Sequence, residues 1–354
     1  MGCEHLRRIG WAAALLVCLC APADAESVKV RVGSPSPWGA ANAAPMYGVT
    51  LGVFAGEGID PEFVSVDGSA ILLPQIGNGA IQFGMPNMDL LAIALDKKEP
   101  YPVKAFYNLY RSQVFEFVVL EDSPLRTIAD LKGRKLGVGF LTWGNLPMTK
   151  VMLQDVGLTW MKDVQVVPVG VGPAAWRRLT TGDVASLNLY LAQHEMMAVA
   201  GTPIRRLPLP ERFKHIFSNG LVANSELMKA DPKVVEGFGR AWAKAQYACE
   251  INVEACVRAY WSFNPSARPL PDKEAEWVAS FVRINRAQMH IFRDGMVDDR
   301  WGDYDPRTWR EFLKIMRDGG QISRDDLPVD ELYTRQFVGP INAWDREAVR
   351  VRAK

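Results

Sequence analysis

The chain has 354 residues, of which 48% are hydrophobic and 23% are charged. This length is too great for one ordinary domain and suits two, and the composition is that of a globular protein rather than a disordered one. The formal net charge is only +1, so there is no basic excess to attract nucleic acid or an acidic membrane surface. We therefore expect a folded protein with no nucleic-acid partner.

The first 25 residues have the pattern of an export signal. Two arginines precede the apolar run 9–21, which is too short to span a bilayer, and an Ala-Asp-Ala cleavage sequence follows at 23–25. Cys20 raises the alternative of a lipoprotein, but a leucine precedes it where a small residue is required. No later segment is long and apolar enough to span a membrane. The sequence predicts a signal peptide over 1–25 and a secreted, periplasmic protein.

Export would leave Cys249 and Cys256 as the cysteines of the mature chain, in an oxidising compartment. In one continuous helix, seven residues of 1.5 Å rise would hold them about 10 Å apart, too far for a disulfide. Asn252 resembles a helix N-cap, and a helix that ends and restarts there would bring the two cysteines together. We therefore favour a structural disulfide, because two thiols alone do not make a metal site.

Strand and helix patterns alternate through the first part of the mature chain. Segment 28–32 alternates valine with charged residues, as a strand with one buried face does. A turn is expected at 56–61. Further strands are predicted at 62–66, 81–85 and 103–110, and helices at 70–77 and 89–95. This order predicts a largely parallel sheet with helices on both faces.

A second α/β unit follows, and it repeats one local layout of the first. Segment 134–156 reads as a strand, a loop with Trp143 and Gly144, and a helix, as 28–49 does around Trp38 and Gly39. Other strands are predicted at 114–120, 164–169 and 184–189, with helices beginning near 173 and 190. The two tryptophan loops suggest two similar lobes that face one another.

From residue 221 onward the pattern is mainly helical. Helices are predicted at 231–249, 252–261 and 271–293, another begins at 305, and 333–342 is expected to be an extended tail. Asp231 and Pro232 are suited to the N-cap and first position of the first of these helices.

Motifs of catalysis are absent from the sequence. There is no H-E-x-x-H, C-x-x-C, G-x-S-x-G or P-loop pattern. Gly137-Val138-Gly139 resembles part of a dinucleotide loop, but Thr142 stands at the third glycine position. His194 and Glu195 would make a base pair, yet such a pair after a strand is more often a solvated helix start. We expect no enzymatic activity, no cofactor and no metal.

The remaining candidates form a binding constellation, because they follow strand ends where α/β sheets hold ligands. They offer aromatic faces, short polar side chains and helix-start amides that suit an anion. The alternative for Trp38 is a core plug, for Ser69 and Asn87 a cap or core position, and for Arg111 a solvated hinge arginine instead of an anion clamp. The candidates are Trp38, Gly39, Asn42, Gly68, Ser69, Asn87, Arg111, Thr142, Trp143, Gly144, Asn145, Asn188 and Tyr190.

Two segments carry a resemblance to a known family. Segments 128–138 (IADLKGRKLGV) and 179–184 (LTTGDV) resemble nitrate/sulfonate/taurine-type periplasmic substrate-binding proteins of ABC transporters, a group related to thiamine-pyrimidine-precursor-binding proteins. The resemblance implies a type II periplasmic-binding-protein fold, in which two α/β lobes are joined by a two-strand hinge, with additional C-terminal helices. Lobe 1 would hold 26–112 and 221–354, and lobe 2 would hold 117–216.

The same resemblance implies a ligand between the lobes, hinge closure around it, and delivery to a permease with its ATPase by a monomeric protein. The family's ligand loops fall on 38–42, 68–69, 87, 142–145 and 188–190. Many members have Trp-Asp where this chain has Tyr190-Leu191, which argues against a ligand ammonium group at that position and leaves an uncharged or anionic solute. We predict a small organic anion. The rivals are a periplasmic sensor subunit and an enzyme of thiamine-pyrimidine synthesis, although the Cys/His-rich site of the latter is missing.

Overall fold

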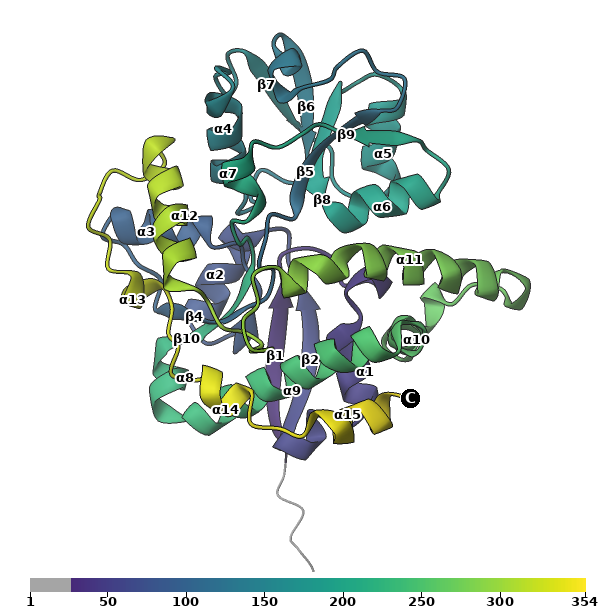
Figure 1. The fold of residues 1–354 in the computed structure, drawn as a ribbon, viewed down its shortest axis with the longest axis vertical. Coiled ribbons are helices and arrows are strands. Elements are labelled where there is room, and N and C mark those ends of the chain that lie inside the picture. The colour runs from purple at the N-terminus through teal and green to yellow at the C-terminus, as the bar shows by residue number, and fades with distance from the viewer. Residues whose placement is uncertain (1–26) are drawn as a thin grey trace, which may run out of the picture.

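The computed structural model describes residues 27–354, and the predicted signal peptide lies outside them. Two five-stranded sheets form the centres of two lobes, one above the other in Figure 1. Their strand orders are β2-β1-β3-β10-β4 and β7-β6-β8-β5-β9. Each sheet has one strand that is antiparallel to both of its neighbours, β10 in the first sheet and β5 in the second. This architecture confirms the predicted pair of α/β lobes.

In the first lobe β1, β2 and β3 are parallel, and β10 is antiparallel to both β3 and β4. Helices cover both faces of this sheet, as the alternating pattern predicts (Figure 1). The strands are β1 (Val28–Ser34), β2 (Ile59–Ser65), β3 (Phe83–Gly84), β4 (Val103–Asn108) and β10 (Gly220–Asn224). The helices are α1 (Ala44–Thr50), α2 (Ser69–Gly77), α3 (Asp89–Asp96) and α8 (Ser225–Ala230).

The start of β2 differs from the sequence prediction. The turn expected at 56–61 ends earlier, because Gly58 takes a positive φ of 69° and the strand begins at Ile59. Pro61 therefore lies inside a strand. It is tolerated because β2 is the edge of its sheet, where a residue without an N–H need not break the ladder.

The second lobe is built in the same way from the middle of the chain. Strands β6, β7 and β8 are parallel, and β5 is antiparallel to β8 and β9. The strands are β5 (Phe115–Leu120), β6 (Arg134–Val138), β7 (Val164–Pro168), β8 (Ser186–Tyr190) and β9 (Ile204–Arg206). The helices are α4 (Leu146–Asp155), α5 (Pro173–Thr180), α6 (Leu191–Val199) and α7 (Glu211–Lys214).

The chain crosses between the lobes twice, from β4 to β5 and from α7 to β10. These crossings make the two-strand hinge. Beyond the hinge, the lobes also touch directly, because the Ala70 amide donates a hydrogen bond to the carbonyl of Thr142 at 3.2 Å. The lobes are therefore closed on one another.

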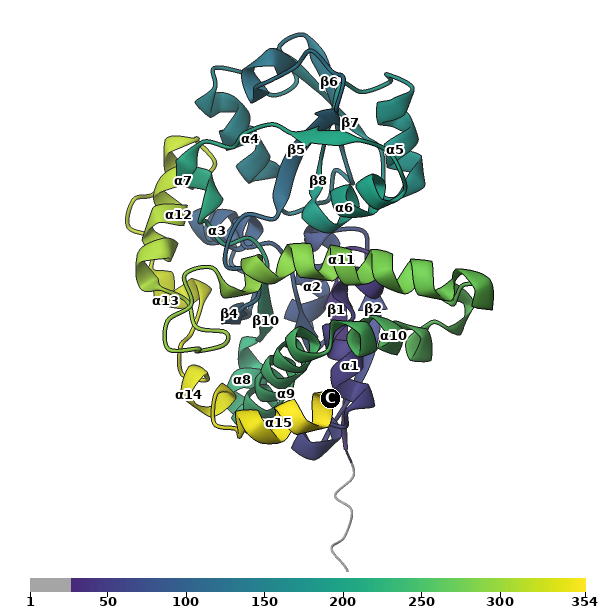
Figure 2. The ribbon, with the colours of Figure 1, turned by 45° about the vertical axis from the view of Figure 1, so that its right-hand side comes forward.

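The C-terminal third adds helices to the first lobe, and some of them reach the second. They are α9 (Pro232–Ile251), α10 (Val253–Phe263), α11 (Glu274–Arg293), α12 (Pro306–Asp318), α13 (Val329–Leu332), α14 (Val338–Ile341) and α15 (Arg346–Ala353). Helix α12 packs against α4 of the second lobe, and α11 packs against α6. Helices α10 and α11, which we call the helical arm (residues 253–293), extend together from the body of the lobe (Figures 1 and 2).

The segment expected to be an extended tail is largely folded. Tyr333 forms a parallel bridge with Ala105 of β4, but Val338–Ile341 is the helix α14. Phe337 and Ile341 are fully buried one helical turn apart, in the core that also contains α9. A helix places both apolar side chains on that core, which an extended chain of the same residues would not do.

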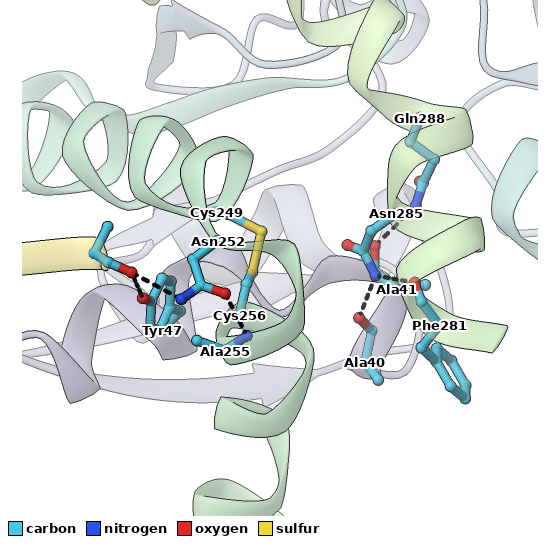
Figure 3. The surroundings of a disulfide bond; sticks show 11 residues. Ala40, Ala41, Tyr47, Cys249, Asn252, Ala255, Cys256, Phe281, Asn285 and Gln288 are labelled. Carbon is cyan, nitrogen blue, oxygen red and sulfur yellow. Dashed lines mark hydrogen bonds between the residues drawn. A yellow bond between two sulfur atoms is a disulfide. The ribbon is translucent and has the colours of Figure 1, made fainter. Parts of the chain in front are cut away.

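Cys249 and Cys256 form a disulfide, as predicted (Figure 3). Helix α9 ends at Ile251, and the side chain of Asn252 accepts a hydrogen bond from the Ala255 amide at 3.1 Å to begin α10. This break brings the two Cα atoms to 5.1 Å. The disulfide therefore fixes the corner at which the helical arm leaves α9.

Replacing both cysteines with serine is expected to destabilise the folded protein by about 2 kcal/mol, since a short cross-linked loop restricts the unfolded chain. Urea unfolding of the oxidised parent and of the double variant would measure the difference. Reduction of the parent should reproduce the loss and should leave the variant unchanged. Equal stability of parent and variant would show that the Asn252 cap alone holds the corner.

The described residues contain no helix with the length and hydropathy needed to cross a membrane.

Candidate functional site

A small cavity of about 50 Å³ lies between the lobes, and we call it the inner cavity. Both lobes, the hinge and the arm contribute to its wall, which carries amide, hydroxyl and aromatic groups and no charged side chain. The lining residues are Pro35, Ser36, Asn42, Ser69, Met85, Asn87, Tyr110, Val114, Phe115, Trp143, Gly144, Asn145, Tyr190, Leu191, Asn219 and Gln288.

The fold explains why these residues meet. In the first lobe, the loops after β1 and β3 and the start of α2 lie at the carboxyl edge of the parallel strands. In the second lobe, the loop before α4 and the end of β8 lie at the corresponding edge. Ligands of open α/β sheets bind at this edge, where the strands end and helices begin. The predicted loops at 69, 87, 143–145 and 190 are thus brought together.

On the first lobe, Ser69 and Asn87 support each other. The Ser69 hydroxyl accepts a hydrogen bond from the Asn87 amide N–H at 3.0 Å, and Asn87 Oδ1 accepts one from the Asp89 N–H at 3.0 Å. Both side chains are buried. Of the alternatives that the sequence left open, the buried position applies and the cap does not, since the N-caps of α2 and α3 are Gly68 and Met88. Both residues also line the cavity.

On the second lobe, Asn145 lines the cavity, and Asn188 holds the Asn145 side chain in position. Asn145 Nδ2 donates to Thr149 Oγ1 at 3.2 Å and, over 3.4 Å, to Asn188 Oδ1. Asn188 is fully buried behind the lining, where its own Nδ2 donates to the Glu116 carbonyl. Asn145 Oδ1 is buried without a hydrogen-bond partner in the described structure. Buried polar atoms are seldom left in that state, so this oxygen has capacity for a ligand donor.

Trp143 is the aromatic centre of the inner cavity. Its ring packs against Phe115 and Tyr190, with centroids 5.7 and 6.0 Å away, and only 5% of the residue is exposed. Its indole Nε1 is buried and has no hydrogen-bond acceptor among the described residues. The indole therefore combines a large apolar surface with an unused donor.

The two tyrosines of the cavity are uncharged hydrogen-bonding groups. Burial raises the pKa of the Tyr110 and Tyr190 phenols above the ordinary value, so both keep their protons at neutral pH. The Tyr190 hydroxyl accepts a hydrogen bond from Gln193 Nε2 at 3.0 Å. It keeps its own proton for donation.

The lobes meet most closely at Gly68, Thr142 and Gly144. Gly68 has a φ of +117°, and a Cβ there would lie 2.4 Å from the Thr142 carbonyl oxygen. The Thr142 hydroxyl donates to the carbonyl of Asp67. A Cβ on Gly144 would lie 2.8 Å from the Ser69 side chain. Gly68 and Thr142 are absent from the cavity lining and instead form the contact between the lobes.

Asp89, which sequence reasoning missed, also joins the lobes. It is the first residue of α3 in the first lobe, and its Oδ2 accepts a hydrogen bond from the Met148 amide at the start of α4 in the second. Burial raises the pKa of this carboxyl to about 8, even though two backbone N–H groups act in the opposite direction. An acidic residue at a helix start is too common a pattern to have indicated this contact.

Trp38 and Gly39 line a second, larger space of about 300 Å³, which we call the outer cavity. The Trp38 indole donates from Nε1 to the Val64 carbonyl at 2.9 Å and packs on Phe63. Trp143 is not part of this lining, so the two tryptophans do not face each other across one cavity as the sequence suggested. The two cavities adjoin, since they share the lining residues Asn42, Tyr110, Tyr190 and Gln288.

Arg111 departs from the prediction that it clamps an anion. It lines neither cavity. Its guanidinium is largely buried and donates to three carbonyl oxygens, those of Asp294 at 2.8 Å, Gly295 at 3.0 Å and Asp303 at 2.6 Å. It fastens the segment after α11 to the hinge. Neither an anion clamp nor a solvated hinge arginine describes these contacts.

Two carboxamides of the lining lie far along the chain from the predicted loops. Asn219, in the second crossing, donates from Nδ2 to the Met85 carbonyl at 2.8 Å. Gln288, on α11, donates from Nε2 to the Ala41 carbonyl at 2.9 Å. No local sequence signal marks either residue, because only packing brings α11 against the loop after β1. Among residues 27–354, no cluster of three or more His, Cys, Asp or Glu side chains could hold a metal ion.

A closed pair of α/β lobes with an uncharged cavity between them defines a two-lobed binding-protein fold. Residues 41–254 match the model of the family described as NMT1/THI5 like, and the chain belongs to this family. The resemblance to nitrate/sulfonate/taurine-type substrate-binding proteins is thereby confirmed.

Known proteins similar to the chain include binding proteins of several solutes. The riboflavin-binding protein RibY of Chloroflexus aurantiacus is 20% identical over 263 residues, which cover 70% of this chain and 68% of RibY. The alkanesulfonate-binding protein SsuA of Xanthomonas axonopodis pv. citri, solved with MOPS, has a TM-score of 0.64 at 14% identity and covers 87% of this chain and 99% of its own. The periplasmic aliphatic sulphonate-binding protein SsuA of Escherichia coli has a TM-score of 0.56 at 13% identity, over 86% and 92% of the two chains.

The same fold is also found in an enzyme. The desulfurization enzyme DszB, solved as a C27S mutant with biphenyl-2-sulfinic acid, has a TM-score of 0.52 at 14% identity, over 88% of this chain and 98% of DszB. At these identities the solved structures establish the fold alone.

Proposed function

We propose that this chain is an exported, periplasmic, non-enzymatic solute-binding protein that captures a small organic anion between its lobes and delivers it to an ABC importer. The observation that carries the proposal is the inner cavity. Both lobes line it, and it contains a buried indole N–H and a buried amide oxygen without protein partners. Such groups are stabilised when a ligand satisfies them. Because the ligand contacts both lobes, its binding favours the closed state that a permease would recognise.

An anion suits the groups that line this cavity. Ser69 begins α2 and Asn145 precedes α4, so the positive end of a helix dipole from each lobe lies beside it. The amides of Ala70 and Met148 are already bonded across the contact between the lobes, so these two would not bond the anion directly. The indole of Trp143 and two neutral phenols add donors. Burial keeps Asp89 protonated at neutral pH, so its carboxyl, which bonds the start of α4, does not repel an anion. No lysine, arginine or histidine lines the cavity, so binding would rest on dipoles rather than on an ion pair.

The comparisons support the import role, since the names of RibY and SsuA describe binding proteins and one SsuA is named periplasmic. The lining has serine and tyrosine hydroxyls but no Cys, His, Lys, Asp or Glu that would activate them, which favours binding over catalysis. His194 pairs with Glu116 at 3.1 Å, but neither lines a cavity. We place the first lobe at 26–112 and 221–354 and the second at 117–216, in a monomer with the predicted permease and ATPase as partners.

A thermal-shift screen tests the proposal, because a ligand that binds only the folded state raises the melting temperature. The panel should contain acids paired with neutral analogues of the same shape, such as a sulfonate with its sulfonamide and an aromatic carboxylate with its carboxamide. Nitrate and pyrimidines complete it. We expect stabilisation by acids and little by their neutral partners. Stabilisation by the neutral partners alone would refute the anionic part of the proposal.

Trp143→Phe tests the indole N–H separately from the ring. The variant keeps an aromatic side chain in the core, so it should fold, and loss of one hydrogen bond should weaken binding by about fivefold. Trp143→Ala is less informative, because truncating a buried tryptophan costs about 3–5 kcal/mol of stability. Calorimetric titration of a screened ligand would measure the change. Unaltered affinity in Trp143→Phe would mean that the indole donor does not contact the ligand.

A further inference from the structure

We infer that the outer cavity is a second compartment of the ligand site, which binds an apolar, ring-sized group attached to the compact head held in the inner cavity. This inference rests on the proposed function and adds the class of ligand: an organic acid with a bulky aromatic or alkyl tail. It assigns the helical arm, rather than the loops at the strand ends, as the element that selects the tail.

The sizes of the two cavities indicate which part of a ligand each could hold. A water molecule needs ~10–15 Å³ of such space, and a cavity of ~150 Å³ accommodates benzene. The inner cavity of about 50 Å³ is therefore large enough for a few polar atoms and too small for a ring. The outer cavity of about 300 Å³ has room for one or two rings. Since the cavities share four lining residues, one molecule can occupy both.

Both cavities expose more apolar than polar surface, and they differ in the kind of residue that lines them. The inner cavity has more carboxamide side chains, one of which, Asn145, has a buried oxygen without a hydrogen-bond partner in the described structure. The outer cavity adds Trp38 from the first lobe, Met196 from the second, and aromatic residues from the arm, with no charged side chain. Its lining is Pro37, Trp38, Gly39, Ala40, Ala41, Asn42, Tyr110, Tyr190, Ala192, Gln193, Met196, Tyr260, Ala267, Trp277, Phe281 and Gln288. Aromatic and thioether surfaces of this kind stabilise an apolar ligand group.

Aromatic packing and hydrogen bonds fix the arm in place beside the outer cavity. Trp277 packs on Phe281 with ring centroids 4.2 Å apart, and on Trp261 at 5.0 Å. Asn285 and Gln288 donate to the carbonyls of Ala40 and Ala41 at 2.9 Å each, so the arm also fixes the loop that carries Trp38 (Figure 3).

The arm also closes the compartment against the second lobe. Helix α11 packs along α6, the helix that supplies Ala192, Gln193 and Met196 to the lining, and both views show the two helices side by side (Figures 1 and 2). The family match ends at residue 254, whereas every arm residue of the lining lies beyond it. The arm therefore adds to the outer cavity a wall that lies outside the matched family region, while α6 supplies the wall inside it.

The experiment compares probes that share a head and differ in the tail. Methanesulfonate, hexanesulfonate and naphthalene-2-sulfonate are titrated calorimetrically, together with acetate, 2-naphthoate and the neutral 2-naphthol. We expect affinity to rise by about fourfold for each buried methylene. Phe281→Ala should remove at least about fivefold of the advantage of the naphthyl probes over the head-only acids, and should leave methanesulfonate and acetate unchanged.

Val282→Ala is the matched control. Val282 is the next residue of α11 and does not line the cavity, although it packs against the cluster of Ala40, Val253 and Val257. It should weaken stability slightly and leave the tail preference intact. Equal effects of the two variants, or no preference for tails in the parent, would refute the assignment of the outer cavity as the site of the tail.

The outcomes also separate this inference from the proposed function. Binding of the head-only acids without any preference for tails would overturn the inference and support the proposed anion site. Binding of 2-naphthol as tight as that of naphthalene-2-sulfonate, lost in Phe281→Ala, would support the outer compartment and overturn the anionic head. Failure of every probe to bind would overturn both.

Discussion

Gly144→Ala is expected to weaken ligand binding by roughly 5- to 150-fold without unfolding the protein. The added Cβ would lie 2.8 Å from the Cβ and Oγ of Ser69 and 2.9 Å from the Cβ of Asn87, across the contact between the lobes. These distances are shorter than van der Waals contact and overpacking of this degree costs about 1–3 kcal/mol, which corresponds to that loss of affinity. Within its own lobe Gly144 has no positive φ, so alanine does not strain the backbone.

Gly56→Ala is the control, because a Cβ at Gly56 has no neighbour within 4 Å and the residue has no positive φ. Ligand affinity by calorimetry and compactness by small-angle scattering should change in Gly144→Ala and remain unchanged in Gly56→Ala. An expanded, weakly binding Gly144→Ala variant would place the close contact on the path of closure. A variant that binds and compacts like the parent would contradict the closed arrangement of Ser69 and Gly144.

Ligand binding is expected to weaken steadily as the pH rises from 5 to 8.5, because Asp89 is buried against α4 in the closed arrangement and we expect opening to hydrate it. In the closed state the pKa of this carboxyl is about 8, against an ordinary value of 3.8. Between these values the closed state binds more protons than a state in which Asp89 is hydrated. Its stability is therefore greatest below pH 4 and falls as the pH approaches 8. One proton per closure sets an upper limit of about tenfold in affinity per pH unit.

Asp89→Asn should abolish this dependence, since its amide oxygen can still accept the hydrogen bond from the Met148 amide and has no proton to lose. The variant should bind more tightly than the parent at pH 8.5 and with similar affinity at pH 5. The measurement is ligand affinity by calorimetry across this range, in buffers of different ionisation enthalpy to count protons taken up.

His215→Gln is needed as a comparison, because His215 titrates in the same range. It lies on the second crossing between the lobes, and contacts with Asp294 and Glu211 raise its pKa, Asp294 having the larger effect. A raised histidine pKa also gives stability that is lost as the pH rises, so the sign is the same. If His215→Gln removes the pH dependence and Asp89→Asn does not, the assignment to Asp89 is wrong.

The sequence predicted the parts of the site that local chemistry specifies. Ser69, Asn87, Trp143, Gly144, Asn145 and Tyr190 all line the inner cavity, because each follows a strand end and parallel strands end at one edge. The helix break at Asn252 was predictable for a similar reason, since a short polar side chain at a helix start satisfies amides in its own turn. Both predictions depend on local features of the sequence, namely where each strand ends and where each helix begins.

The tertiary structure decided the features that depend on distant segments. Arg111 was a candidate anion clamp in sequence, and only the fold shows three carbonyls of the segment after α11 around it. Trp38 and Trp143 occupy matching loops, yet Trp38 lines the outer cavity together with Trp277 and Phe281 of the arm, whereas Trp143 lines the inner cavity. Asp89 reaches Met148 across 59 residues of sequence.

The difference between what the sequence predicted and what the fold decided has one physical cause. Hydrophobic periodicity, capping residues and glycine positions act over a few residues, and by themselves they determined two α/β lobes, a family resemblance and the strand-end loops of a binding site. Cavity shape, the burial of a carboxyl and the partners of an arginine depend on which surfaces pack together. In this protein that packing depends on the position of α11, which lies against α6 and against the loop after β1, where Gln288 donates to the carbonyl of Ala41.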